Sequence, residues 1–318
     1  MALSRRAFFR TLFAASQAGL VGRLLAGTAP TGDDLSGALN FAIIGDWGRH
    51  GRPDQRAVAK QMGVACKNAG ASFVISVGDN FYEDGVDSVR DRHWDKSFES
   101  VYTAPSLQVP WYVILGNHDY RGSCEAQLEY GKTHPRWIMP ARHYTHVHSV
   151  DASTSLECFY IDTSPMIGEY QADPMMWGIH SQDVGQQLAW LDQSLAASKA
   201  PWKIVIGHHP IYSAGWGHGS EQEMIRLVLP ILQKHKVQAY FCGHDHDLQH
   251  LKTGDLHLVI SGGGSEHRPV ATIAETQFSQ GVSGFALASV RAHEMQVRFI
   301  DDKGKLLHTA TVPRTATT

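Results

Sequence analysis

The sequence predicts an α/β fold, because short apolar runs alternate with stretches of helical periodicity over most of its 318 residues. With 43% hydrophobic and 19% charged residues, the composition is that of a globular protein with a large core, and it excludes a disordered chain. The formal net charge of −3 argues against a protein that binds the nucleic-acid backbone, since such a protein presents a basic face. We find no internal repeat or interdomain linker and expect one domain at residues 38–314.

The predicted strands are four or five residues long and rich in β-branched and aromatic residues, which is typical of strands buried in a sheet. They lie at Phe41–Ile44, Phe73–Val77, Trp111–Leu115, Cys158–Ile161, Lys203–Ile206, Ala239–Cys242 and Leu256–Ile260. Apolar residues on one face predict helices between several of them, over residues 53–69, 183–197 and 221–235. Pro230 should kink the last helix, because proline has no backbone N–H to donate.

The C-terminal segment has a different pattern, in which strand-like runs follow one another without helices. These runs are Phe285–Val290, Glu294–Ile300 and Leu306–Val312, and residues 301–304 form a turn between the last two. The succession predicts a set of antiparallel hairpins.

The N-terminal 29 residues have the composition of an export signal. Four arginines and no acidic residue occur there, an apolar stretch follows at residues 11–27, and small residues come next. Arg5 and Arg6, followed by two phenylalanines, resemble the bacterial twin-arginine signal. The alternative is a membrane-anchoring helix, but Arg23 interrupts a run already shorter than the ~20 residues that a span needs. We therefore expect the twin-arginine export machinery as a partner, a periplasmic or secreted protein, and no stable membrane span.

Four cysteines remain, at positions 66, 124, 158 and 242, and no two of them form a Cys-x-x-Cys pair. This spacing excludes a zinc ribbon and a thioredoxin-like site. Cys66, Cys158 and Cys242 lie in apolar segments and are expected to be buried as small hydrophobic residues. Whether any pair forms a disulfide in an exported protein stays open.

Five of the predicted strands end in glycine followed by residues that can bind a metal. The five motifs are Gly-Asp-Trp-Gly at 45–48, Gly-Asp-Asn-Phe-Tyr at 78–82, Gly-Asn-His-Asp at 116–119, Gly-His-His-Pro at 207–210 and Gly-His-Asp-His at 243–246. Each motif alone is most simply explained as a turn. Together they predict that the side chains meet at one place, because the carboxyl ends of the strands of an open α/β sheet line one crevice. Oxygen and imidazole donors without thiolates suit Fe, Mn or Zn, and there are enough of them for two ions.

This ordered set of motifs resembles the calcineurin-like metallophosphoesterases. The tyrosine of Gly-Asp-Asn-Phe-Tyr narrows the resemblance to the purple acid phosphatases, and the short spacing is similar to the small, tartrate-resistant type. The likeness runs from about Phe41 to the final strands. It implies a four-layer sandwich, with two mixed β-sheets face to face and helices outside, in which the C-terminal hairpins would complete the second sheet.

The resemblance also implies which residues hold a binuclear centre of Fe(III) and a divalent ion, either Fe, Zn or Mn. The ferric ligands would be Asp46, Tyr82 and His246, those of the divalent ion Asn117, His208 and His244, and Asp79 would bridge both. A phenolate and carboxylates are anionic oxygen donors that suit a trivalent ion, whereas neutral asparagine and histidine suit a divalent one.

The expected activity is that of an acid phosphatase hydrolysing phosphate monoesters. A metal-bound hydroxide would attack phosphorus in line, and His118 would act as general acid toward the leaving alkoxide. His209 would either contact substrate or line the cleft, and Asp119 would either orient nearby groups or serve the turn. The alternatives are a phosphodiesterase of the same superfamily and, less favoured because every ligand is present, a non-catalytic binding module.

Overall fold

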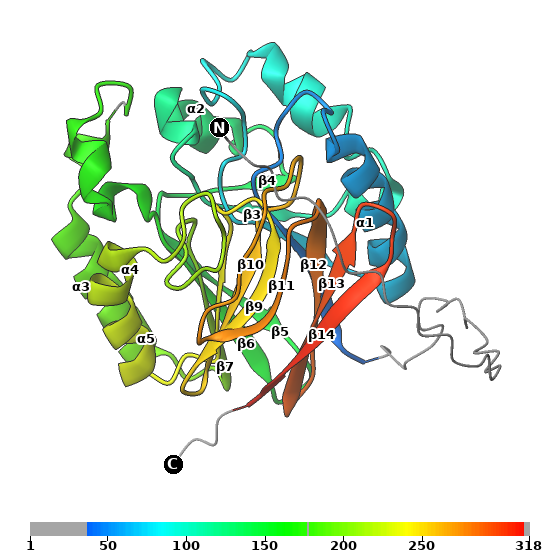
Figure 1. The fold of residues 1–318 in the computed structure, drawn as a ribbon, viewed down its shortest axis with the longest axis vertical. Coiled ribbons are helices and arrows are strands. Elements are labelled where there is room, and N and C mark those ends of the chain that lie inside the picture. The colour runs from blue at the N-terminus through cyan, green and yellow to red at the C-terminus, as the bar shows by residue number, and fades with distance from the viewer. Residues whose placement is uncertain (1–36, 177, 315–318) are drawn as a thin grey trace, which may run out of the picture. The chain divides into compact units, whose positions relative to one another are not determined.

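The computed structural model describes residues 37–176 and 178–314, which form two seven-stranded sheets with helices on their outer faces (Figure 1). The first sheet has the strand order β14 (Leu306–Pro313), β13 (Glu294–Asp301), β12 (Gly284–Val290), β1 (Leu39–Ile44), β2 (Phe73–Ser76), β3 (Trp111–Val113) and β4 (Trp137–Ile138). The second has the order β11 (Thr276–Gln280), β9 (Leu248–Thr253), β10 (Leu256–Ser261), β8 (Ala239–Cys242), β7 (Trp202–Ile206), β6 (Ser155–Tyr160) and β5 (Tyr144–Ser149). The predicted signal peptide at residues 1–29 lies outside the described residues.

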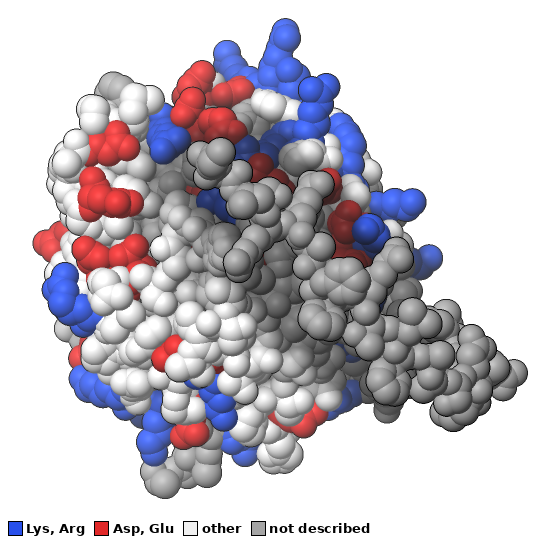
Figure 2. All heavy atoms as spheres, viewed as in Figure 1, with Lys and Arg blue, Asp and Glu red and all other residues white. Residues whose placement is uncertain are grey.

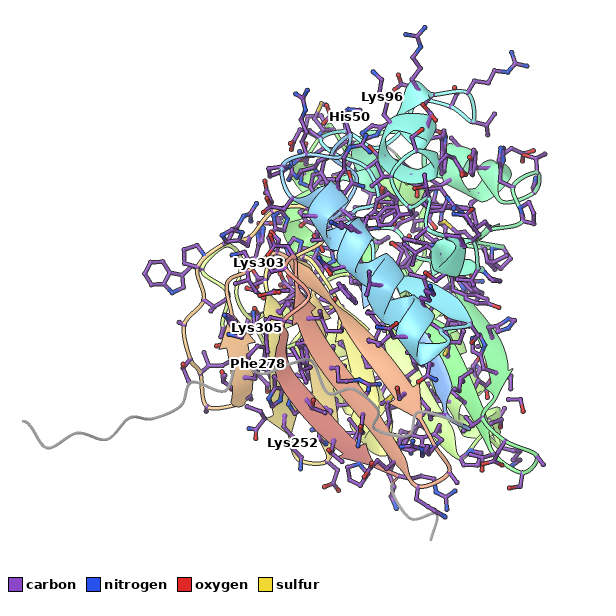
Figure 3. All side chains as sticks on the ribbon, turned by 90° about the vertical axis from the view of Figure 1, so that its right-hand side faces the viewer. His50, Lys96, Lys252, Phe278, Lys303 and Lys305 are labelled. Atoms are coloured by element: carbon purple, nitrogen blue, oxygen red, sulfur yellow. The ribbon has the colours of Figure 1, made fainter. Side chains whose placement is uncertain are left out.

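In the part of the chain that the structure describes, five α-helices flank the sheets. They are α1 (Gln55–Ala69), α2 (Cys124–Tyr130), α3 (Val184–Ala197), α4 (Gln222–Leu227) and α5 (Leu229–Lys234). Short helical turns complete the connections, at η1 (Trp94–Glu99), η2 (Pro105–Leu107), η3 (Asp119–Arg121), η4 (Ser164–Met166), η5 (Gly168–Ala172) and η6 (Ile179–Ser181). Figure 1 shows α3, α4 and α5 on one side of the sheets, and Figure 3 shows α1 lying along the other side. The predicted kink is confirmed as a break at Val228, with Pro230 at the start of α5.

The sheets are mixed, as predicted, but the C-terminal hairpins join a different sheet from the one expected. In the first sheet β1, β2, β3 and β4 run parallel, and β12 pairs antiparallel with β1. The expectation that these hairpins complete the second sheet is therefore wrong. The second sheet is instead completed by β9 and β11, whose segments the sequence did not mark as strands. The alternation of apolar runs with helical segments predicts where strands lie in the sequence, but it does not determine which strands pair in a sheet.

Alternate residues of the central strands face two different apolar cores. Phe41 and Ile43 of β1 pack between the sheets, in a cluster that also contains Ile204 of β7. Ala42 of β1 faces outward, in a cluster that also contains Val58 of α1. A strand covered on both faces is apolar throughout, which explains why these runs lack the alternation of a half-exposed strand.

Three histidines close one end of the core between the sheets. His250 Nε2 lies 2.9 Å from His257 Nδ1, and His250 Nδ1 lies 3.2 Å from His308 Nε2, which belongs to the other sheet. The ring of Phe278, labelled in Figure 3, stacks on His308 with centroids 4.8 Å apart. Burial lowers the pKa of His250 to about 3 and that of His257 to about 4, so both rings are neutral in the folded protein.

The folded protein should therefore lose stability in acid through His250. Its folded pKa lies below the unfolded value of about 6.5, so its contribution is complete above that pH and declines as the pH falls toward about 3. Between about pH 7.5 and about pH 5 the expected loss from this residue is up to about 2 kcal/mol. In His250→Gln the decline in the free energy of unfolding over this interval, measured with urea, should be smaller by that amount. His293→Gln, at an exposed position between β12 and β13, should decline as much as the wild type, and an unchanged decline in His250→Gln would contradict the prediction.

The structure also bears on the predictions about cysteines, membrane spans and surface charge. All four cysteines are buried free thiols. Among the described residues, no helix has both the length and the apolar character needed to cross a membrane. On the face in Figure 2, acidic and basic side chains are interspersed.

Candidate metal centre

The predicted metal-binding residues lie where the two sheets bring their strand ends together. Asp46 follows β1, Asp79 follows β2 and Asn117 follows β3, so the first sheet supplies these side chains. His208 follows β7, and His244 and His246 lie between β8 and β9 of the second sheet. All of these side chains are buried. The carboxyl ends of parallel strands meet at one edge of a sheet, and here the edges of two sheets meet at one place.

Tight turns let these residues approach one another. Asp46, Asp79 and His244 have φ values of 60°, 48° and 69°, a left-handed conformation that costs free energy in residues other than glycine. The preceding turns require glycine, because a Cβ on Gly116 would lie 2.2 Å from Asp79 Oδ1 and one on Gly243 would lie 2.3 Å from Asp46 Oδ2. Steric crowding therefore explains why glycine occupies these positions before the predicted ligands.

The hydroxyl of Tyr82 lies at the meeting point of the residues predicted for the ferric ion. Its oxygen is 3.0 Å from Asp46 Oδ1, 2.8 Å from Asp79 Oδ2 and 3.0 Å from His246 Nε2. Tyr82 follows Asp79 by three residues, and a short loop turns both side chains to the same point. Four oxygen and nitrogen donors thus surround one small volume.

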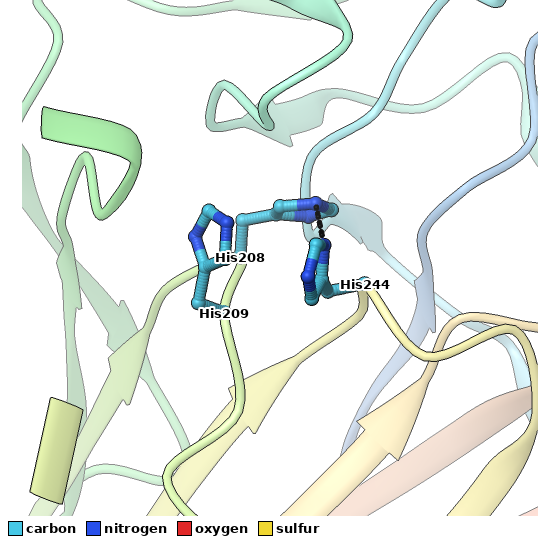
Figure 4. Close-up of side chains that lie close together, drawn as sticks. All are labelled: His208, His209 and His244. Atoms are coloured by element: carbon cyan, nitrogen blue, oxygen red, sulfur yellow. Dashed lines mark hydrogen bonds between the residues drawn. The ribbon is translucent and has the colours of Figure 1, made fainter. Parts of the chain in front are cut away.

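A second group of donors adjoins the first and shares Asp79 with it. His208 Nε2 lies 3.3 Å from His244 Nδ1 (Figure 4). The same atom lies 3.2 Å from Asn117 Oδ1 and 3.4 Å from Asp79 Oδ1. Asp79 therefore directs Oδ2 to the tyrosine group and Oδ1 to the histidine group. This is the placement expected of a carboxylate that bridges two ions.

Hydrogen bonds behind the site leave the facing ring nitrogens free to accept. His208 Nδ1 is 2.9 Å from the carbonyl oxygen of Val77, and His246 Nδ1 is 2.8 Å from Glu266 Oε1. A nitrogen that donates to such an acceptor carries the proton, so Nε2 presents its lone pair to the centre. When neutral, both rings are held in the tautomer that can ligate a metal. Burial lowers the pKa of His208, but Asp79 and Asp46 outweigh this effect and raise that pKa to about 9, so without a metal ion this ring is protonated.

The charges of the site fit a cation at its middle. Burial raises the pKa of Asp46 well above its usual value, and the neighbouring Asp79 raises it further despite the opposing effect of His208. Burial also raises the pKa of Tyr82, and both aspartates add to that shift. Burial opposes ionisation of Asp79, but His208 and His118 outweigh it and lower the pKa of this carboxyl. Two carboxyl groups and a phenol at such short distances repel one another when all are ionised, and bound metal ions would offset this repulsion.

The two residues predicted to act on substrate lie in different environments. His118 is partly exposed: its side chain keeps 17% exposure, and Nδ1 lies 2.5 Å from the carbonyl oxygen of Glu83. His209 is fully buried, with Nδ1 2.8 Å from Thr163 Oγ1 and Nε2 3.2 Å from the hydroxyl of Tyr170. Figure 4 shows His209 beside His208 and His244, so its position supports a wall of the site over a contact with substrate.

Asp119 ties the loops of the site together. Its buried carboxylate accepts hydrogen bonds from the backbone N–H of Gly116 at 2.8 Å and of Asn80 at 3.1 Å, and from Gln127 Nε2 at 2.8 Å. Burial and the charge of Asp79 raise its pKa to about 7. These contacts support the orienting role over that of a simple turn residue.

The sequence reasoning missed several side chains beside the centre. The Cζ atom of Arg49 lies 3.8 Å from the centroid of the Tyr82 ring, and Glu266 holds His246. The ring of His218, which is exposed and has its Nε2 3.1 Å from Arg268 Nη1, lies 3.9 Å from that of His244. Only the fold brings them to the centre, since none belongs to a strand-end motif.

The chain is similar to a known protein family and to individual proteins over most of its length. The model of the calcineurin-like phosphoesterase family matches residues 39–248. Purple acid phosphatase 4 of Arabidopsis thaliana is 39% identical over 86% of this chain and 83% of its own length. Tartrate-resistant acid phosphatase type 5 of Homo sapiens is 34% identical over 89% of this chain and 94% of its own.

Two solved structures share the architecture. GAP50, described as the anchor in the inner membrane complex of Plasmodium, aligns with a TM-score of 0.77 at 26% identity, over 88% of this chain and 90% of that one. The purple acid phosphatase PPD1 from yellow lupin (Lupinus luteus) seeds aligns with a TM-score of 0.65 at 16% identity, over 87% of this chain and 54% of that one. The second likeness supports the fold alone.

Proposed function

The chain is an acid phosphatase of the calcineurin-like phosphoesterase family, among the purple and tartrate-resistant acid phosphatases, and we propose that it hydrolyses phosphate monoesters in acid with Fe(III) and a divalent ion. The observation that carries the proposal is the phenol oxygen of Tyr82 within 3.0 Å of Asp46, Asp79 and His246. This arrangement matches the donor set that separates purple acid phosphatases from relatives without the tyrosine.

Each proposed ion has its own side of the centre. Asp46, Tyr82 and His246 would hold Fe(III), Asn117, His208 and His244 would hold the divalent Fe, Zn or Mn, and Asp79 would touch both. When bound, the two ions supply Lewis acidity toward the phosphate oxygens and the means to activate water.

We assign the transfer of a proton to the leaving group to His118. Its Nδ1 is held by the carbonyl of Glu83, so the other ring nitrogen is the one free to approach an ester oxygen. Its backbone N–H donates to Asp79 Oδ1 at 2.8 Å, which ties the position of the ring to the bridging carboxylate. The buried His209 would line the site beside His208 and His244, whose ring centroids lie 4.9 Å and 4.4 Å from its own.

The proposal is tested against its alternative, a phosphodiesterase, by kinetics and metal analysis on one preparation. The purified protein should contain iron and should have a higher kcat/KM for an aryl monoester than for the corresponding diester. The preference should hold throughout the acid range. A preference for the diester, or the absence of iron from fully active protein, would overturn the proposal.

We further propose that residues 1–29 direct export through the twin-arginine machinery, which transports folded proteins. The ligands come from distant segments, so the site is completed only when the chain folds, and export of a folded protein would let the ions bind first. Replacing Arg5 and Arg6 by lysine should leave active, metal-containing enzyme inside the cell, as measured by activity in cell fractions. Undiminished export of this variant would remove the twin-arginine assignment without affecting the phosphatase proposal.

A further inference from the structure

Arg49 joins two acidic residues on either side of the tyrosine that lies at the centre of the site. It follows Asp46 by three residues, and its Nη2 donates to Glu266 Oε1 at 3.0 Å. Its Nη1 forms a hydrogen-bonded ion pair with Glu83. Its Cζ atom lies 3.8 Å from the centroid of the Tyr82 ring. The guanidinium thus makes two ion pairs and one cation–π contact at once.

The Glu266 end of this bridge leads directly to a predicted metal ligand. Glu266 Oε1 accepts from both Arg49 Nη2 and His246 Nδ1, and Arg268 Nη2 lies 3.8 Å from the same oxygen. A fixed carboxylate behind a histidine sets the orientation of the ring and makes its other nitrogen a better donor.

The Glu83 end leads to the proposed proton donor. The backbone carbonyl of Glu83 accepts from His118 Nδ1 at 2.5 Å, while its carboxylate pairs with Arg49. Arg49 keeps only 15% of its side chain exposed, against 63% for Glu83. An isolated surface ion pair contributes little, but here the arginine is largely buried and contacts the tyrosine ring as well.

Resting on the proposed function, we propose that Arg49 is a positioning residue, which holds Tyr82 and His246 in place for the ferric ion and stabilises the phenolate with a permanent positive charge. Arginine suits both tasks, because its guanidinium is always charged and its planar fork can bind two carboxylates while stacking on a ring. Lysine supplies the charge without the fork. The two tasks can therefore be separated by substitution.

Absorption spectra and rates of metal release test the two tasks in the metal-loaded protein. In Arg49→Gln, the phenolate loses a nearby cation and becomes a stronger electron donor, so the visible phenolate-to-iron band should move to longer wavelength. Release of iron to excess chelator should be ~10–100-fold faster, the usual effect of removing a residue that supports metal ligands. Arg49→Lys should keep the band close to its wild-type position but release iron faster. Arg56→Gln removes an equal charge from an exposed position on α1 and should change neither.

Unchanged band position and release rate in Arg49→Gln would overturn the proposal. If Arg49→Gln fails to fold, a wild-type release rate in Arg49→Lys would overturn the positioning task, and faster release with an unmoved band would support it. A colourless wild type that nevertheless holds metal would contradict the proposed phenolate–iron pair instead. The release of that metal from the same variants would still decide for or against Arg49.

Discussion

Replacing His118 by alanine should lower the turnover of alkyl phosphates by ~10²–10⁴-fold, the usual cost of losing a positioned general acid. Metal content should stay the same, because the bond from this position to Asp79 comes from the backbone N–H, which alanine retains. An alkoxide leaves poorly without a proton, so the loss should be largest for such substrates. An aryl phosphate with an activated phenolate leaving group should lose much less.

The comparison of the two substrates decides the role of His118. Turnover of an alkyl and an activated aryl phosphate should be measured on the variant and the wild type, with metal content determined in each preparation. His293→Ala, at an exposed position far along the chain, serves as control and should behave as the wild type. Equal losses on both substrates with intact metal content would argue against a general acid and for a role in substrate binding.

Replacing Tyr82 by phenylalanine should abolish the violet-to-pink colour expected of the oxidised, iron-loaded protein. The substitution removes only the oxygen that lies between Asp46, Asp79 and His246, while the ring can keep its contacts with Arg49 and His118. This visible band would arise from a phenolate bound to Fe(III), and no other ligand of the predicted set could replace that phenolate. Absorption spectra and iron analysis of the same samples provide the measurement.

A second buried tyrosine offers a matched control. The hydroxyl of Tyr170 lies 3.2 Å from His209 Nε2 rather than against the residues predicted for the ferric ion, so Tyr170→Phe should keep the band. A Tyr82→Phe protein that retains the band would show that the colour has another source. A colourless wild type with a full complement of iron would favour an ordinary metallophosphoesterase and strengthen the diesterase alternative.

The sequence predicted the strands and residues of the site best where a strand ends in a motif. The runs at Phe41–Ile44 and Ala239–Cys242 are buried on both faces, so their composition alone marked them as strands. The strand β5 was missed because its residues alternate between the core and solvent and include His146 and His148. The strand β9 was missed because two buried polar residues, Gln249 and His250, interrupt its apolar pattern.

What the sequence could not show depends on contacts between loops distant along the chain. The bond between Arg49 and Glu266 spans 217 positions, and neither residue follows a strand in a recognisable motif. The placement of β12 beside β1 likewise depends on how a complete chain packs, because an antiparallel hairpin fits the edge of either sheet. The local sequence pattern predicted which residues at the strand ends could bind a metal. Long-range packing determines which other residues, such as Arg49 and Glu266, contact them.

The division of the donors between the sheets has a mechanical consequence. Asp46, Asp79 and Asn117 follow strands of one sheet, and His208 and His244 follow strands of the other. Bound ions would therefore connect the two sheets at the carboxyl ends of these strands. Sliding of one sheet over the other would then have to break metal–ligand bonds as well as apolar contacts. An ion that binds only the folded form adds about 4 kcal/mol to its stability at a thousand times its dissociation constant. The unfolding midpoint of this enzyme should therefore report how fully its centre is loaded, even in samples without substrate.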